Sequence, residues 1–156
     1  MPQRSAPSLG IILSNMGSPS APTPDAVRDY LREFLSDPAI VDLPRLLWLP
    51  LLHGIILRTR PRRVARRYAS IWTADGSPLA SITRRQAAAL QGALRSHMDR
   101  EVFIEPGMRY GLPSLRDAVD ALRDRHCAHI VLLPLYPQHS IATTGSTIKA
   151  AGPLAL

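Results

Sequence analysis

Three short runs of apolar residues divide the chain, and each predicts a buried β-strand. The runs occupy residues 9–13, residues 102–104 with an extension towards Met108, and residues 129–135. A short apolar run that ends in turn-forming residues is typical of a strand covered on both faces. The pattern therefore predicts three strands, all of them buried.

Between these runs, apolar residues recur at helical spacing. The expected helices cover residues 24–36, 60–72, 83–98 and 114–122. Thr23 and Ser114 can each cap a helix start, and Pro24 fits the first helical position. Thr83 with Gln86 predicts a capping box for the third helix. Strands that alternate with helices predict an α/β fold, in which a doubly wound parallel sheet carries helices on both faces.

The segments that follow the three expected strands hold much of the unusual chemistry of the chain. They are residues 15–18, 108–111 and 136–140. Ligands of open parallel sheets bind beyond the carboxyl ends of the strands. We therefore expect a functional site at this edge of the sheet.

Hydroxyl and amide side chains crowd residues 136–146, directly after the third strand. They could cradle an anionic group together with backbone N–H groups at a helix start, or they could form an ordinary strand-to-helix turn. His139 could bind a metal or carry a proton near neutral pH, although a lone histidine is more often a surface or packing residue. Arg109 could pair with a ligand carboxylate or hold neighbouring loops by hydrogen bonds.

Composition and charge limit the function classes. The 156 residues are 46% hydrophobic and 20% charged, which is typical of a globular domain. The formal net charge is +7, and every basic residue except Lys149 is arginine. The arginine-rich residues 58–67 raise nucleic-acid binding as an alternative, but only Tyr68 and Trp72 accompany them, so we expect no nucleic-acid partner. The single cysteine, Cys127, excludes an intrachain disulfide.

The apolar residues 43–57 do not predict a membrane-spanning helix. Pro44, Arg45, Pro50 and His53 interrupt them, and the stretch is shorter than the roughly 20 apolar residues that a span needs. The apolar run at residues 9–13 is too short for the core of a signal peptide. We therefore expect a cytoplasmic location.

The order of short motifs along the chain resembles the ferrochelatase family. The motifs are Asn15-Met16-Gly17-Ser18-Pro19, Phe34-Leu35-Ser36-Asp37-Pro38, Ile71-Trp72, Gly76-Ser77-Pro78-Leu79, Met108-Arg109-Tyr110-Gly111, Leu133-Pro134-Leu135-Tyr136-Pro137-Gln138 and Thr143-Thr144-Gly145-Ser146. Each motif is unspecific alone, but their shared order over about residues 9–146 is specific. The resemblance implies the chelatase fold, in which a porphyrin lies between two similar doubly wound α/β lobes.

The resemblance also implies an activity, the insertion of Fe2+ into protoporphyrin IX to form protohaem, the last step of haem biosynthesis. Coproporphyrin III as the substrate, or a porphyrin- or haem-binding module without activity, are the alternatives. Family chains are much longer, and their metal-ligating histidine and basic glutamate lie in the second lobe. We therefore expect residues 1–156 to form the N-terminal lobe alone, with the C-terminal lobe absent and the isolated chain inactive.

A set of porphyrin-binding residues follows from the resemblance. They are Met16, Arg67, Tyr68, Ser77, Arg109, Tyr136, Ser140 and Thr143. No catalytic residue is implied within the chain, and His139 is the one candidate metal ligand. Ile141 stands where animal members carry a cluster-ligating cysteine, so we expect no iron–sulfur cluster and no bound cofactor, with Fe2+ as a substrate. Residues 43–57 resemble the lip of the pocket, which implies peripheral membrane contact; a buried helix pair is the alternative.

Overall fold

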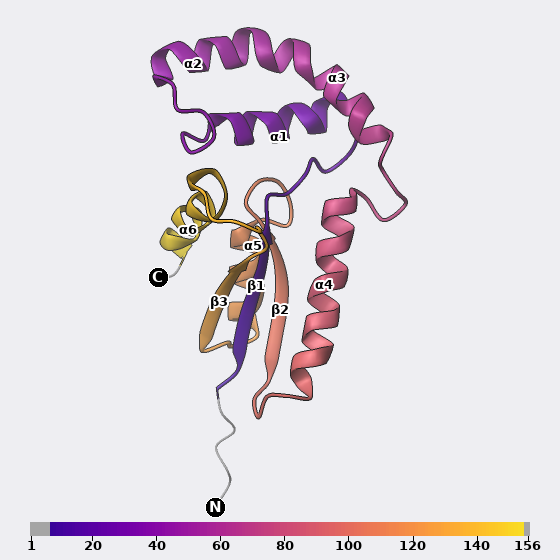
Figure 1. Cartoon of the computed structure of the whole chain (residues 1–156), viewed down its shortest axis with the longest axis vertical. Helices are drawn as coiled ribbons and strands as arrows, with labels where there is room; N and C mark the ends of the chain where they lie inside the picture. The colour runs from indigo at the N-terminus through magenta and orange to yellow at the C-terminus, as the bar shows by residue number, and fades with distance from the viewer. Residues whose placement is uncertain (1–6, 155–156) are drawn as a thin grey trace, which may run out of the picture.

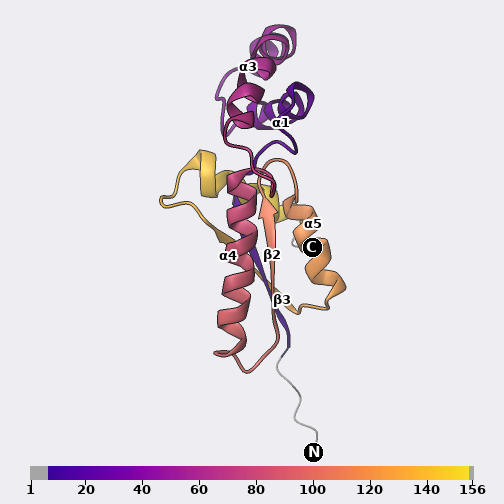
Figure 2. The same cartoon turned by 90° about the vertical axis from the view of Figure 1, so that its right-hand side faces the viewer.

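A three-stranded parallel sheet forms the centre of the computed structural model, which describes residues 7–154 (Figure 1). The strands β1 (Leu9–Asn15), β2 (Val102–Met108) and β3 (His129–Pro134) lie in the order β2-β1-β3. Helices α4 (Pro78–Arg95) and α5 (Leu115–Asp124) cover opposite faces of the sheet (Figure 2). The predicted α/β class is confirmed, while the domain bounds expected at residues 1 and 156 lie outside the described residues.

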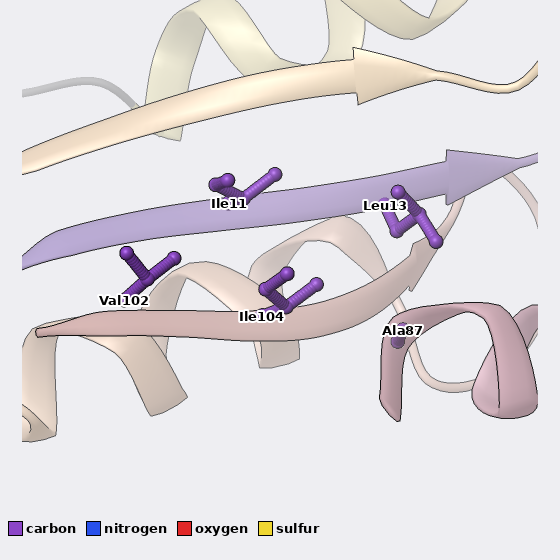
Figure 3. Close-up of a cluster of buried hydrophobic side chains, with 5 residues drawn as sticks. All are labelled: Ile11, Leu13, Ala87, Val102 and Ile104. Atoms are coloured by element: carbon purple, nitrogen blue, oxygen red, sulfur yellow. The ribbon is translucent and has the colours of Figure 1, made fainter. Parts of the chain in front are cut away.

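Alternate residues of β1 point to the two covered faces. Figure 3 shows the cluster on the α4 side, which joins Ile11, Leu13, Val102, Ile104 and Ala87. On the opposite face Ile12 packs against α5, where Leu122 is fully buried. Successive side chains of a strand point to opposite faces, which explains why residues 11–13 of β1, between two helix layers, are all apolar.

The third strand is an edge strand, and the prediction that it is buried is wrong for the described chain. β3 pairs with β1 alone, and Val131 and Leu133 are 47% and 42% exposed. An apolar run reports that side chains favour burial, but it does not report the position of the strand in the sheet. Leu132 still packs against the α5 core.

A second helical layer lies beyond the carboxyl end of the sheet (Figure 1). It consists of α1 (Pro24–Ser36) and a continuous rod of α2 (Arg45–Leu51), the π-helical η1 (Leu52–Ile56) and α3 (Leu57–Ala69). The rod buries Leu52, Ile56 and Leu57 against α1. The predicted bounds 60–72 are therefore wrong at both ends: packing against α1 extends the helix towards the N-terminus across Pro50, and α3 ends at Ala69 with Ser70 as its C-cap.

The capping predictions succeed for two helices and fail for one. Thr23 Oγ1 accepts the Ala26 N–H at 3.4 Å, and Ser114 forms a capping box at the start of α5. The capping box predicted at Thr83 is wrong, because the N-cap of α4 is Ser77, six residues earlier. Thr83 lies inside the helix and donates to the Leu79 carbonyl at 2.8 Å.

The segment after β3 folds into three short helical turns beside the strand ends (Figure 1). They are η2 (Ile141–Gly145), α6 (Ser146–Ala151) and η3 (Gly152–Leu154). Among the described residues, no helix combines the length and the apolar character that crossing a membrane requires.

Candidate functional site

The three segments that follow the strands meet at one edge of the sheet, as the sequence predicts. Backbone hydrogen bonds join the first two, from Arg109 N–H to the Asn15 carbonyl at 2.8 Å and from Tyr110 N–H to the Met16 carbonyl at 2.9 Å. The third is held by its preceding residue, because Leu135 N–H donates to the Ser14 carbonyl at 2.7 Å. These bonds continue the parallel pairing past the ends of the strands. They fix the relative positions of the predicted porphyrin contacts Met16, Arg109 and Tyr136.

A tight turn at Gly17 places Met16 at this edge. Gly17 has φ +95°, and a Cβ atom there would lie 1.8 Å from the Tyr110 carbonyl oxygen. The following Ser18 is buried and shares a hydrogen bond of 2.6 Å with Ser77 Oγ. The glycine is therefore required by both backbone conformation and space.

Four tyrosines, all those in the sequence, surround the same edge. The Tyr30 hydroxyl donates to the Gly17 carbonyl at 3.3 Å. Burial raises the pKa of Tyr30 far above its ordinary value, and the neighbouring Tyr68, Tyr110 and Tyr136 act in the same direction. Burial likewise raises the pKa of Tyr110 to about 12. These phenols therefore stay protonated at neutral pH and serve as ring surfaces and hydrogen-bond donors.

Aromatic contacts link the helical layer to the strand ends. Phe34 stacks on Tyr30 with ring centroids 5.9 Å apart, and it meets Tyr110 edge-on at 5.1 Å. The Tyr136 hydroxyl is buried and has no hydrogen-bond partner, although Thr147 lies close enough to act on its pKa in the lowering direction. Burial has the larger effect and raises the pKa of Tyr136.

Arg109 donates its hydrogen bonds within the chain. Its Nη2 binds the Asp37 carboxylate, and its Nε donates to Ser146 Oγ at 2.7 Å. The guanidinium also lies over the ring of Tyr110, 4.3 Å from the centroid. The sequence allows two roles for Arg109, and the structure shows one of them: its hydrogen bonds hold neighbouring loops together. Contact with a porphyrin stays a prediction for this residue.

The remaining predicted residues occupy different settings. Ser77 is buried and caps α4, where its Oγ accepts the Ala80 N–H at 3.2 Å. Arg67 is exposed on α3, and Tyr68 packs edge-on against Trp72.

Ser140 and Thr143 bond to each other through hydroxyls 2.6 Å apart and form the capping box of η2. Their hydroxyls therefore support the turn interpretation of residues 136–146, while Ser140 remains exposed.

No metal centre forms among the residues that the structure describes, since they contain no group of three His, Cys, Asp or Glu side chains suited to an ion. His139 is exposed and belongs to no such group among these residues. Sequence reasoning missed Asp37, which it interpreted only as a helix stop, and Ser146. Their one signal was that both lie in the motifs of the family resemblance.

Comparison with known proteins decides the family. The sequence profile of ferrochelatase matches residues 8–154. The chain belongs to the ferrochelatase family. Ferrochelatases are lyases of haem biosynthesis, and all eight predicted porphyrin contacts of this chain lie within the matched residues.

Bacterial ferrochelatases match this chain at about half of the aligned positions. The protein of Azoarcus sp. strain BH72 is 51% identical over 139 residues, which cover 89% of this chain and 38% of that protein. The ferrochelatase of Mannheimia succiniciproducens is 52% identical over 135 residues, which cover 86% of this chain and 42% of that protein. The ferrochelatase of Teredinibacter turnerae is 49% identical over 144 residues, which cover 92% of this chain and 39% of that protein. The chain spans about two fifths of the length of these relatives.

Proposed function

We propose that this chain supplies the porphyrin-binding wall of an enzyme that inserts Fe2+ into protoporphyrin IX and forms protohaem. The observation that carries the proposal is the convergence of residues 15–18, 109–111 and 136–146 at one sheet edge, in a chain of the ferrochelatase family. This edge offers the half-buried Met16, whose polarisable thioether suits contact with an aromatic ring.

Metal insertion places three demands on the protein. The flat macrocycle must bend so that its pyrrole nitrogens face the ion, two protons must leave, and the ion must lose water. A rigid wall that fits the bent ring favours the transition state over the free substrate. The hydrogen-bonded turn at Gly17 and the aromatic cluster around Phe34 provide such rigidity.

The proton acceptor is a separate requirement, because a general base works best with a pKa near neutrality. Burial raises the pKa values of Tyr30 and Tyr110, so these hydroxyls do not take up the leaving protons at neutral pH. We propose that the base and the metal ligand come from the part of the relatives that this chain does not match, which is more than half of their length. The isolated chain is accordingly expected to be inactive.

We also propose that residues 43–57 touch a membrane surface peripherally. Leu46 and Leu47 are 90% and 73% exposed on α2, while Leu52 and Ile56 on the other side of the rod are buried. Large apolar side chains exposed next to one another favour an apolar partner. The cytoplasmic location and the expected lack of a nucleic-acid partner, a bound cofactor and an iron–sulfur cluster stay predictions.

A chimera tests the proposed activity. This chain replaces the matched 139 residues of the Azoarcus ferrochelatase, and anaerobic Fe2+ insertion is followed by the absorbance change of the porphyrin. We expect protoporphyrin IX to be metallated well above the uncatalysed rate. In the same chimera Met16→Ala should slow turnover, and the control Ile148→Ala, at a position 55% exposed on α6, should not.

Each other result of this assay contradicts a stated part of the proposal. Faster metallation of coproporphyrin III would make that ring the substrate. Porphyrin binding without metallation would favour a non-enzymatic binding module. A folded chimera that neither binds nor metallates a porphyrin would contradict the proposed function as a whole.

A further inference from the structure

We propose that Asp37 is a positioning residue for porphyrin binding, because its carboxylate ties the end of α1 to the two segments that complete the strand-end site. The inference rests on the proposed function and extends it to a residue outside the eight predicted porphyrin contacts.

The local sequence directs the Asp37 side chain away from α1 and towards the sheet. Asp37 precedes Pro38, and a residue before proline avoids the helical region of backbone conformation. It has φ −76° and ψ 122°, and it ends α1 as the C-cap residue. Its Oδ1 accepts the Ala39 N–H at 2.8 Å, which fixes the orientation of the carboxyl group.

The second carboxylate oxygen receives three donors from segments distant in sequence. Arg109 Nη2, the Tyr110 hydroxyl and Ser146 Oγ all donate to Asp37 Oδ2, the last two at 2.8 Å each. The Asp37 and Arg109 side chains are only 10% and 19% exposed. Hydrogen bonds to a charged acceptor are stronger than neutral ones, and limited exposure reduces their screening by water.

From Asp37 the contacts lead to the predicted porphyrin contacts in two directions. Towards β1, the backbone of Arg109 and Tyr110 holds the carbonyls of Asn15 and Met16. Towards η2, the Arg109 Nε donates to both Oγ and the carbonyl of Ser146, at 2.7 and 3.2 Å.

Ser146 directly follows the turn that contains Ser140 and Thr143. The Asp37 carboxylate therefore sets the distance between the turn at Gly17, which carries Met16, and η2, which carries Thr143 and is capped by Ser140.

Loss of the carboxylate would leave Arg109 without its counter-charge in a mostly buried position. Removing one partner of such a pair costs more than the pair contributes, since the remaining charge stays desolvated. Arg109 would then reorient towards water and release Ser146 and Tyr110. Residues 109–111 and the segment from η2 to Ser146 would then move apart, although the strands of the sheet would remain paired.

The test compares Asp37→Asn with Val119→Ala in the full chain. Val119 is buried on the α5 face, so its truncation lowers stability without touching the strand-end site. Protoporphyrin IX is titrated into each protein, with binding followed by fluorescence quenching and by the position of the Soret band, and stability is measured by urea unfolding. We expect Asp37→Asn to weaken binding about tenfold and to shift the Soret band of the bound ring, and Val119→Ala to do neither.

A double variant tests the route through arginine. If Asp37 acts through Arg109, then Asp37→Asn in an Arg109→Gln background adds little to the loss from Arg109→Gln alone. If Asp37→Asn does not fold, Ser146→Ala removes one of the same donors at small structural cost and should weaken binding several-fold relative to Val119→Ala.

The outcomes separate the two levels of the argument. A wild-type chain that binds no protoporphyrin overturns the proposed function. A wild-type chain that binds it, with Asp37→Asn and Ser146→Ala both indistinguishable from Val119→Ala, overturns the positioning role alone. Fully additive losses in the double variant overturn the route through Arg109.

Discussion

The turn at Gly17 should not tolerate even a methyl group. The residue has φ +95°, a conformation that L side chains rarely adopt. A Cβ atom would lie 1.8 Å from the carbonyl oxygen of Tyr110 and 2.9 Å from its carbonyl carbon. Both atoms belong to the backbone, so no side-chain rotation can relieve the contact.

The expected cost of Gly17→Ala follows from these contacts. Left-handed conformation costs an alanine about 1–2 kcal/mol. Relief of the clash must separate Tyr110 from residues 16–17 and weaken the Tyr110 N–H to Met16 carbonyl bond, which is worth about 0.5–1.5 kcal/mol. Alanine also leaves the unfolded chain fewer conformations than glycine does, which offsets the loss of stability by about 0.4–1 kcal/mol. Since strain from the remaining displacement adds to these terms, we expect a loss of about 2 kcal/mol or more.

Urea unfolding followed by circular dichroism measures this loss. The matched control is Gly92→Ala in α4, where a Cβ atom meets nothing within 4 Å. Alanine should stabilise that helix by about 0.5–1 kcal/mol. A Gly17→Ala protein as stable as the wild type would refute the reasoning that this turn requires glycine.

Three further perturbations have defined outcomes. Burial raises the pKa of Asp37, but the hydrogen bonds from Ala39, Ser146 and Tyr110 and the charge of Arg109 outweigh it and hold this pKa below its ordinary value. The carboxylate therefore stabilises the fold above about pH 4 and loses this effect as the pH falls through the lower folded pKa. Urea unfolding should therefore show the gap between wild type and Asp37→Asn shrinking below about pH 4, and a gap unchanged down to pH 2 would contradict this. Leu122→Ala removes a side chain with no exposure from the α5 core and should cost about 2–5 kcal/mol by the same assay, whereas a cost under about 1 kcal/mol would mean that the core is packed differently. Replacing Leu46 and Leu47 together by serine should reduce sedimentation with lipid vesicles while urea unfolding stays unchanged, and equal sedimentation would remove α2 from the membrane contact.

The sheet and its functional edge could be predicted because their signals are local. The run at residues 9–13 is apolar at every position, and Ile11 and Ile12 indeed pack on opposite covered faces. Ser114 and Asp117 cap α5 within four residues of each other. The meeting of the strand ends then follows from the geometry of any parallel sheet.

The wrong predictions of helix bounds concern positions where contacts with residues distant in sequence determine the structure. Thr83 and Gln86 have the spacing of a capping box, but α4 already begins at Pro78, where the Ser77 cap is bound to Ser18. The rod over residues 45–69 continues through two prolines because its buried side packs on α1. Local patterns carry no information about either contact.

The Asp37 network is the extreme case of a long-range feature. Its carboxylate meets Arg109 and Ser146, which are 72 and 109 positions away in the sequence. An aspartate before a proline is a sufficient explanation for the end of a helix, so the sequence alone offers no reason to look further. Only the folded arrangement of α1 beside the strand ends gives this side chain its partners.

Hydrogen–deuterium exchange of the chain with and without protoporphyrin IX locates the bound ring without any substitution. The ring should slow exchange in residues 15–18, 109–111 and 136–146, where the strand-end segments are joined. Exchange at the C-terminal end of α5, where Leu122 packs beside Gly10 near the start of β1, should not change. Protection confined to α5 and the exposed edge of β3, or saturable binding without protection at the strand ends, would contradict the placement of the porphyrin at this edge.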